Sequence, residues 1–356
     1  MPPKNGLACV IAAGGTGGHV LPSLAVAEAL RARGVTVTFA GSPDRVEAEL
    51  VPEAGYEFDP FRVSGFPREA SVALLRAVAL AGRAPLECRR ILAERRPDVV
   101  LGGGGYVAGP MVLAAWTHGT PAALTEADSH LGLANRLASP FARRVFLSFP
   151  IEGLGPPKYR VTGRPVHARS QPTSREEGRA RFELPPDGPV VLVFGGSQGA
   201  RSLNEIVVEQ FAAAGPSILH LAGERDYETL RPRVTRPDYR LVPYTHDFGA
   251  ALGACDLVLC RAGGSVYELA AAGKPAVLVP YPHATADHQA KNARHFEHAG
   301  AALVVPDAEI ARAPALVRGL LADPPRLAAM SERMVAAARP NAADEIAEEL
   351  IALARA

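Results

Sequence analysis

Short apolar runs alternate with longer stretches of helical period along most of the chain, and this alternation restricts the folds open to it. Strands that are apolar throughout and separated by helices are typical of parallel sheets with both faces covered. In the first half we expect strands at 7–13, 35–40, 98–101, 121–125, 144–147 and 159–162. In the second half we expect strands at 189–194, 217–221, 239–242, 257–260, 276–280 and 302–305. The pattern predicts an α/β protein with two doubly wound, Rossmann-like domains.

The length also favours two domains, because 356 residues exceed the roughly 250–300 at which a single core stops growing. The polar stretch GRPVHARSQPTSREEG marks a linker, which we place at 164–178. It separates an N-terminal domain over 1–163 from a second domain over 179–340. A last helix over 341–356, with Asn341 as its N-cap, could pack back on the N-terminal domain or close the second one.

Composition excludes several functions. The net charge of +1 gives no indication of a nucleic-acid partner. None of the four cysteines lies in a CxxC pair or has zinc-site spacing, so we expect free thiols in a reducing compartment. No uncharged apolar run approaches the roughly 20 residues that span a bilayer, and the N-terminal run lacks the basic region of a signal peptide. We expect a soluble protein, or one peripheral to a membrane.

Glycine clusters follow four of the predicted strands: GGTGGH at 14–19, GGGG at 102–105, GGSQG at 195–199 and AGGS at 262–265. Ligands of parallel α/β sheets bind beyond the carboxyl ends of the strands, where glycine allows close backbone approach. Helices that begin there present free N–H groups to anions. One cluster alone is equally compatible with a tight turn, but four predict ligand sites that face a cleft.

The clusters do not match the common nucleotide motifs. GGTGGH does not fit GxGxxG, and no GxxxxGK[ST] loop occurs. The absence of a DxD pair argues against a metal-bridged diphosphate, so we expect no metal and no cofactor. GGSQG does fit GxSxG, with Ser197 as a hydrolase nucleophile. We prefer a turn in which Ser197 donates a hydrogen bond to phosphate or sugar, because a hydrolase leaves the other clusters unexplained.

The segment CRAGGSVYELAAAGKP predicts the richest ligand site. Backbone N–H groups at 263–265 suit a diphosphate, and Arg261 adds charge before the turn. Glu268, one turn into the next helix, suits the two ribose hydroxyls or, alternatively, a capping box with Ser265. Gln289 in DHQAKN has donors and acceptors for sugar hydroxyls.

Taken together, five stretches resemble the MurG family of UDP-N-acetylglucosamine–N-acetylmuramyl-(pentapeptide) pyrophosphoryl-undecaprenol N-acetylglucosaminyltransferases. They are GGTGGHVLPSLAVAEAL, PDVVLGGGGYVAGP, VFGGSQGARSLN, CRAGGSVYELAAAGKPAVLVP and DHQAKNA, in the family's order. The resemblance implies the glycosyltransferase B fold, with UDP-N-acetylglucosamine mainly in the second domain and lipid I along the first, across an interdomain cleft.

The resemblance also implies site residues. In VPYTHDF, the backbone of Thr245 would meet the uracil and Phe248 would pack against it. The remaining candidates for substrate binding are Thr16, Gly17, Gly18, Tyr106, Asp128, Arg164, His167, Ser197, Arg261, Gly263, Gly264, Ser265, Glu268 and Gln289.

Three departures from the family pattern affect these candidates. The chain reads TEAD where the family usually reads HEQN, so Asp128 replaces an asparagine and cannot donate to the sugar. GNPVR becomes GRPVH, so His167 replaces an arginine and Arg164 would supply that charge. The turn from Arg261 to Glu268 is one residue shorter than expected, which shifts the register of the diphosphate site.

His19 is the candidate general base. It lies at the first turn of the helix after GGTGGH, and a neutral imidazole with a pKa near the reference of about 6.5 is suited to accept a proton from a sugar hydroxyl. The helix N-terminus disfavours the charged ring. The alternative is that His19 only caps the loop or binds the donor, with Glu126 or Asp128 as base.

The segment 66–97 combines Leu74, Leu75 and Val78 with many arginines. It predicts either a helix pair with a solvated basic face or a docking face for an anionic membrane. The resemblance implies a peripheral protein on the cytoplasmic face of the cell membrane.

The resemblance implies an inverting glycosyltransferase of peptidoglycan synthesis that transfers N-acetylglucosamine from UDP to the muramyl 4-hydroxyl of lipid I, forming lipid II. Inversion needs one in-line displacement, with a base on the acceptor and stabilisation of the leaving UDP. The alternatives are another enzyme of this fold, such as a UDP-sugar 2-epimerase or a different lipid glycosyltransferase, and a non-enzymatic nucleotide-sugar-binding protein.

Overall fold

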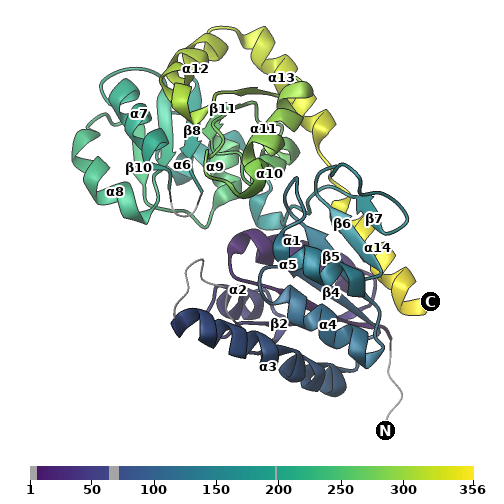
Figure 1. Cartoon of the computed structure of the whole chain (residues 1–356). Coiled ribbons are helices and arrows are strands. Elements are labelled where there is room, and N and C mark those ends of the chain that lie inside the picture. The colour runs from purple at the N-terminus through teal and green to yellow at the C-terminus, as the bar shows by residue number, and fades with distance from the viewer. Residues whose placement is uncertain (1–5, 64–71, 197–198) are drawn as a thin grey trace. The chain divides into compact units, whose positions relative to one another are not determined.

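The structure is a computed structural model that describes residues 6–63, 72–196 and 199–356. The chain forms two compact units, each a parallel sheet covered by helices (Figure 1). The first unit takes the chain up to His167 and again from Arg339 to Ala356, and the second comprises Ala168–Ala338. The predicted fold class of two Rossmann-like domains is confirmed.

The sheet of the first unit has seven parallel strands in the order β3-β2-β1-β4-β5-β6-β7. Their bounds are β1 Ala8–Ala13, β2 Thr36–Gly41, β3 Glu57–Pro60, β4 Val99–Gly104, β5 Ala122–Glu126, β6 Arg144–Leu147 and β7 Tyr159–Val161. All but β3 follow predicted runs. The edge strand β3 is exposed or half-buried along its length, so it lacks the apolar run by which the others are found.

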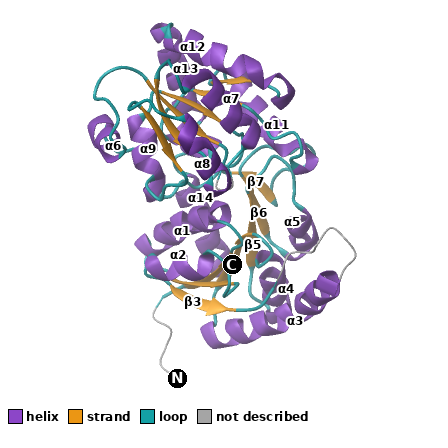
Figure 2. Cartoon of the chain, turned by 90° about the vertical axis from the view of Figure 1, so that its left-hand side faces the viewer, coloured by secondary structure: helices purple, strands orange, loops and turns teal. Residues whose placement is uncertain are grey.

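Successive side chains of β1 alternate between the two faces of this sheet, and each face has its own core. Ile11 packs with α1 (Gly17–Ala32), α2 (Glu47–Glu53) and α14 (Ala342–Arg355). Val10 packs with α3 (Val72–Arg95), α4 (Ala108–His118) and α5 (Leu133–Ala138) on the other face (Figure 2). The last helix therefore completes the core of the first unit, and its Leu350 is fully buried there.

The sheet of the second unit has six parallel strands in the order β10-β9-β8-β11-β12-β13, all at predicted runs. Their bounds are β8 Val190–Phe194, β9 Ser217–Leu221, β10 Tyr239–Val242, β11 Leu257–Cys260, β12 Ala276–Leu278 and β13 Ala302–Val304. The helices of this unit are α6 Arg175–Arg181, α7 Arg201–Phe211, α8 Glu224–Leu230, α9 Phe248–Ala254, α10 Val266–Ala271, α11 His288–His298, α12 Ala313–Leu321 and α13 Pro324–Ala337.

Three local features differ from the sequence expectations. Strand β4 continues through Gly104, so most of the glycine cluster belongs to the strand instead of following it. The stretch 72–95 is one helix and not a helix pair. Helix α6 begins within the expected linker, because Ser174 and Glu177 form a capping box. Among the helices described, none combines the length and apolarity needed to cross a membrane.

Candidate active site

The first candidate site lies where the strand order of the first sheet reverses, between β1 and β4, the place at which doubly wound sheets bind ligands. Here the Gly14 N–H donates to the Gly104 carbonyl at 3.3 Å. A Cβ on Gly105 would lie 2.1 Å from the Gly14 oxygen, and one on Gly104 would lie 2.4 Å from His19 Nδ1. Glycines therefore let the two loops interlock and let the His19 ring lie on the end of β4.

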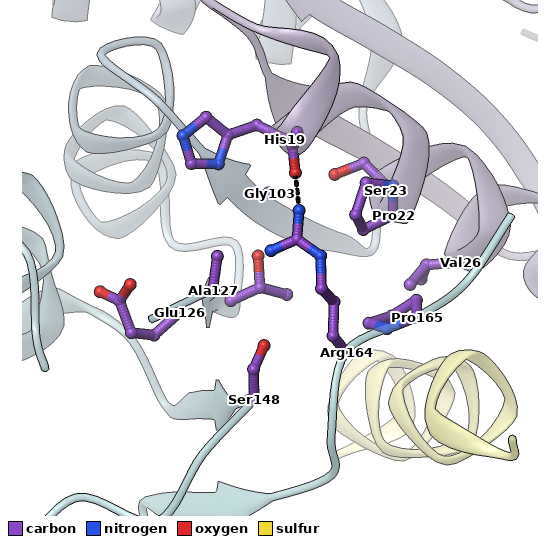
Figure 3. A pocket seen from close by; sticks show the side chains of 12 residues that line it. His19, Pro22, Ser23, Val26, Gly103, Glu126, Ala127, Ser148, Arg164 and Pro165 are labelled. Atoms are coloured by element: carbon purple, nitrogen blue, oxygen red, sulfur yellow. Dashed lines mark hydrogen bonds between the residues drawn. The ribbon is translucent and has the colours of Figure 1, made fainter. Parts of the chain in front are cut away.

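His19 lines a small pocket together with Ser23, Glu126, Ser148 and Arg164 (Figure 3). Burial, and then the positive charge of Arg164, lower the pKa of His19 to about 4, and Asp128 opposes this only partly. The expectation of a pKa near 6.5 was wrong, because the sequence does not show that the ring is covered or that Arg164 lies beside it. The imidazole is neutral throughout the physiological range.

Arg164 is buried and donates to the main-chain carbonyl of Gly18 in the first turn of α1, as Figure 3 shows. The predicted cation at this position therefore lies beside His19. His167, which replaces the family's arginine, is buried with its Nε2 3.2 Å from Glu28 Oε1 of α1. Its contact with substrate stays a prediction.

Glu126 ends β5 with its carboxyl group engaged by the chain. Oε2 accepts from the Gly132 N–H and from Asn135 Nδ2, both at 2.9 Å, and Oε1 accepts from the Asp128 N–H at 3.2 Å. Burial raises the pKa of Glu126, and these donors oppose the rise. These hydrogen bonds hold the turn after β5 in its conformation. The role of Glu126 as the base stays a prediction.

The remaining candidates of the first unit are accessible. Thr16 and Gly18 are exposed, Gly17 and Asp128 are half-buried, and Tyr106 after β4 is 54% exposed. The stretch 16–18 opens helix α1, and Thr16 is its N-cap without a side-chain cap bond. This end of α1 is therefore free of an internal side-chain cap.

The second candidate site lies beyond the carboxyl ends of β8, β11 and β12, in an open pocket of about 510 Å³. Gly195 and Gly199 line it after β8, Arg261 after β11, and Tyr281 and Gln289 after β12. Ser197 lies outside the described residues. Arg261 and Gln289 both line this pocket, although the strands before them are separated in sequence.

Arg261 is held by the protein itself. Its guanidinium donates to Asp307 Oδ1 at 2.6 Å, to Ser202 Oγ at 2.8 Å and to the Val279 carbonyl at 3.0 Å. Asp307 offsets part of the positive charge of Arg261, and the contact of Arg261 with the diphosphate stays a prediction. The sequence did not reveal this ion pair, because Asp307 lies far along the chain from Arg261.

The turn 263–265 leads into α10, with Gly263, Gly264 and Ser265 all half-buried. Ser265 makes no side-chain cap bond, so the capping-box alternative for Glu268 is wrong. Glu268 instead accepts a hydrogen bond from Ser170 Oγ. Gln289 Oε1 accepts from the Tyr281 N–H at 2.9 Å, and its Nε2 lies 4.0 Å from a Cβ built on Gly263.

Thr245 and Phe248 lie between β10 and β11, and Phe248 is the first residue of α9. Thr245 Oγ1 accepts from the Asp247 N–H at 3.0 Å, and Phe248 packs edge-on against Phe194 with ring centroids 5.3 Å apart. Both side chains are half-buried. Their contact with a base stays a prediction.

Two arginines of the second pocket were not among the sequence candidates. Arg225 donates to both carboxylate oxygens of Asp226, at 2.9 and 3.0 Å, and Arg201 Nε lies 3.9 Å from Asp226 Oδ1. Two cations thus share one carboxylate, whose pKa Arg225 lowers. The only sequence signal was their position, because Arg201 follows the GGSQG cluster and Arg225 follows β9.

Comparison with known proteins agrees with this architecture. Residues 9–147 match the glycosyltransferase family 28 N-terminal domain, and residues 190–346 match its C-terminal domain. The UDP-N-acetylglucosamine–N-acetylmuramyl-(pentapeptide) pyrophosphoryl-undecaprenol N-acetylglucosamine transferase of Acidithiobacillus ferrooxidans is 44% identical over 356 residues, covering 96% of each chain. The crystal structure of Acinetobacter baumannii MurG superimposes with a TM-score of 0.75 at 28% identity, covering 97% of this chain and 99% of that one.

Other enzymes share the fold. A UDP-N-acetylglucosamine 2-epimerase from Neisseria meningitidis superimposes with a TM-score of 0.67 at 14% identity, a likeness of fold alone. Two Rossmann-like units, each with glycine loops at its switch point, thus define the class of proteins with the two-domain glycosyltransferase B fold, which glycosyltransferases and epimerases share. The chain belongs to glycosyltransferase family 28 and, within it, to the MurG N-acetylglucosaminyltransferases.

Proposed function

We propose that this enzyme transfers N-acetylglucosamine from UDP-N-acetylglucosamine to the muramyl 4-hydroxyl of lipid I, with inversion, and so forms lipid II. The observation that carries the proposal is the 44% identity to a relative of that name over 96% of both chains. The two pockets described above support it, because each lies at the carboxyl ends of its own sheet.

The second unit would hold the donor. The carboxyl group of Glu268, at the first turn of α10, would accept the ribose hydroxyls, with the Ser170 hydroxyl fixing its orientation. Gln289 would bind sugar hydroxyls through its amide group, whose position the Tyr281 N–H sets. Thr245 and Phe248 would bind the uracil.

The leaving UDP needs positive charge where its diphosphate charge develops. Arg261 is engaged with Asp307, whereas Arg201 and Arg225 share Asp226 and keep a net positive charge at the pocket. We therefore assign stabilisation of the leaving diphosphate to Arg201 and Arg225, together with the N–H groups of the turn 263–265. Arg261 keeps this pocket in shape by linking β11 to Asp307.

The first unit would supply the base. The His19 ring is neutral at physiological pH, so a ring nitrogen can accept the proton of the acceptor hydroxyl as C1 is attacked. Arg164 destabilises the protonated ring, which favours release of that proton after transfer.

We also propose that the first unit docks on an anionic membrane surface at the cytoplasmic face, where the isoprenoid of lipid I is buried. Its helices α3, α4 and α5 carry exposed apolar side chains, among them Leu86 at 69% and Trp116 at 58% exposure. Arg83, Arg89 and Arg90 are exposed on α3. Arg90 also pairs with Glu94, but both side chains are largely exposed. Arg95 is not part of this face, because it is less exposed and pairs with both Asp59 and Glu57.

The test is a product analysis with the purified full chain. With UDP-N-acetylglucosamine and a short-chain lipid I analogue, we expect UDP release and an acceptor heavier by one N-acetylhexosamine, with a β linkage by NMR. Without the acceptor, NMR of the nucleotide sugar detects 2-epimerisation, which mass alone does not. Epimerised donor would favour an epimerase, and donor binding with no product in either reaction would favour a binding protein.

A further inference from the structure

The buried side chain of Glu47 forms a hydrogen bond with the glycine loop 14–18 of the first unit. It is the first residue of α2 and is fully buried, with 0% exposure. Its Oε2 accepts from the Gly15 N–H at 2.9 Å, and its Oε1 accepts from the Ser42 N–H at 3.0 Å. One carboxyl group thus links the loop after β1 to the loop after β2.

Glycines make room for this carboxyl group. A Cβ on Gly14 would lie 2.2 Å from Glu47 Oε1, and a Cβ on Gly41 would lie 2.8 Å from Glu47 Cγ. Side chains at these two positions would displace Glu47. The glycines at 14 and 41 are therefore needed for an internal contact, whereas Gly17, with nothing near its built Cβ, faces open space.

This contact takes the place of a ligand. In Rossmann folds, the N–H groups of the glycine loop after the first strand commonly bind a phosphate. Here the N–H of Gly15 is already bonded to a carboxyl oxygen of the same chain. The first half of the loop is therefore closed to phosphate, and the residues that remain accessible are those leading into α1 and His19.

We propose that Glu47 is a positioning residue for glycosyl transfer. It fixes the loop 14–18, and through this loop the start of α1, so that His19 is held at the geometry of the transfer step. The Gly15 N–H, bonded to Glu47, takes no part in binding a phosphate. The expected loss of turnover rests on the proposed function. The expected loosening of the loop rests on the geometry alone.

The test compares Glu47→Gln with Glu49→Gln, a matched control, because Glu49 lies on the same helix and is exposed. Glutamine keeps the shape but places an NH₂ group against one of the two N–H donors, since only one of its terminal atoms accepts. Misplacement of reacting groups by a fraction of an ångström to an ångström reduces turnover by about 10- to 100-fold. We expect Glu47→Gln to lower kcat by that range with donor KM changed less than about two-fold.

Hydrogen exchange gives a readout independent of activity. We expect the peptide that contains Gly15 to exchange faster in Glu47→Gln than in the parent, and at the parental rate in Glu49→Gln. Should Glu47→Gln fail to fold, Glu47→Asp, which retains both acceptors on a shorter side chain, takes its place in both measurements.

Three results would overturn the inference: parental exchange around Gly15, parental kcat in the folded variant, or a raised donor KM with unchanged kcat. The last would mean that the loop binds the donor directly. If the parent transfers no sugar at all, the proposed function fails, but the exchange measurement still decides whether Glu47 holds the loop.

Discussion

The guanidinium of Arg164 donates a hydrogen bond to the carbonyl of Gly18, the residue directly before His19. This bond joins the end of the first sheet, after β7, to the first turn of α1. It places a fixed positive charge beside the candidate base, and the charge contributes to the lowered pKa of His19. The pH dependence of the enzyme should therefore depend on a residue that does not itself transfer a proton.

We expect the acid limb of kcat/KM to lie near pH 4, because kcat/KM reports the free enzyme, a base is lost when it is protonated and the pKa of His19 is about 4. Arg164→Met removes the charge but not the burial, so this limb should move upward, to a value between 4 and the reference of about 6.5. A pH–rate profile measures the shift, and Arg136→Met, exposed on α5, is the control. An unmoved limb would mean that His19 does not set it.

His19→Ala should reduce kcat by about 10²–10⁴ with little change in donor KM, as expected for a general base. His118→Ala on α4 controls for loss of an imidazole elsewhere in the same unit. A variant with near-parental kcat and a raised donor KM would instead make His19 a binding residue, and the turn after β5 would then have to supply the base.

Glu268→Ala should raise the donor KM about ten-fold or more, because hydrogen bonds to a charged group contribute about 1.5–3 kcal/mol. Ser170→Ala removes only the group that orients the carboxyl, so its effect should be smaller. Glu297→Ala, an exposed substitution on α11, should leave KM unchanged. Equal donor KM in all three folded variants would exclude Glu268 from the ribose site.

Replacing Arg89 and Arg90 by glutamine should weaken binding to anionic vesicles at low salt, by about 1 kcal/mol for each basic residue near the surface. Leu86→Gln with Trp116→Gln should weaken it also at high salt, since apolar burial is not screened. The control is the pair Arg294→Gln and Arg326→Gln on the second unit. Vesicle binding that only the control pair reduces would place the docking face on the other unit.

His220 offers a prediction about stability. It is fully buried, with Nδ1 2.9 Å from the Tyr239 hydroxyl and Nε2 3.0 Å from Asn204 Oδ1. Burial lowers its pKa to about 3, whereas the unfolded ring titrates near 6.5. Because the unfolded state binds the proton more readily, the free energy of unfolding of the second unit should fall as pH decreases from about 6.5 toward 3.

His220→Leu should reduce this pH dependence. At neutral pH it should also destabilise the second unit by about 2–5 kcal/mol, since two buried polar groups lose their partner. Urea unfolding at pH 7 and 5 measures both effects, and His246→Leu on an exposed turn is the control. A slope in His220→Leu equal to that of the parent would assign the pH dependence to other groups.

The sequence predicted every strand but one, because buried parallel strands are apolar along their whole length and stand out locally. It also predicted which loops carry the candidate sites, since the carboxyl ends of parallel strands meet at one edge. It did not predict the partners of the charged residues. Arg261 meets Asp307 and Gly15 meets Glu47 across long separations in sequence, and no local pattern records such pairs.

The same limit applies to the pKa of His19. The motif predicts that His19 lies in the first turn of a helix. The pKa of its ring depends on its contacts with Gly104 and Arg164, which belong to distant segments of the chain. Residue type and spacing therefore gave the candidates, and tertiary contacts decided which of them are available to a ligand.

The discontinuity of the first unit has a consequence for synthesis of the protein. Ile346, Leu350 and Leu353 of α14 fill its core, yet they leave the ribosome after the whole second unit has emerged. The first unit therefore cannot complete its core until α14 has been synthesised, and until then one face of its sheet is incompletely covered. The second unit can fold as soon as its own residues have emerged. A nascent chain that stalls near its end would present that apolar face to chaperones or proteases.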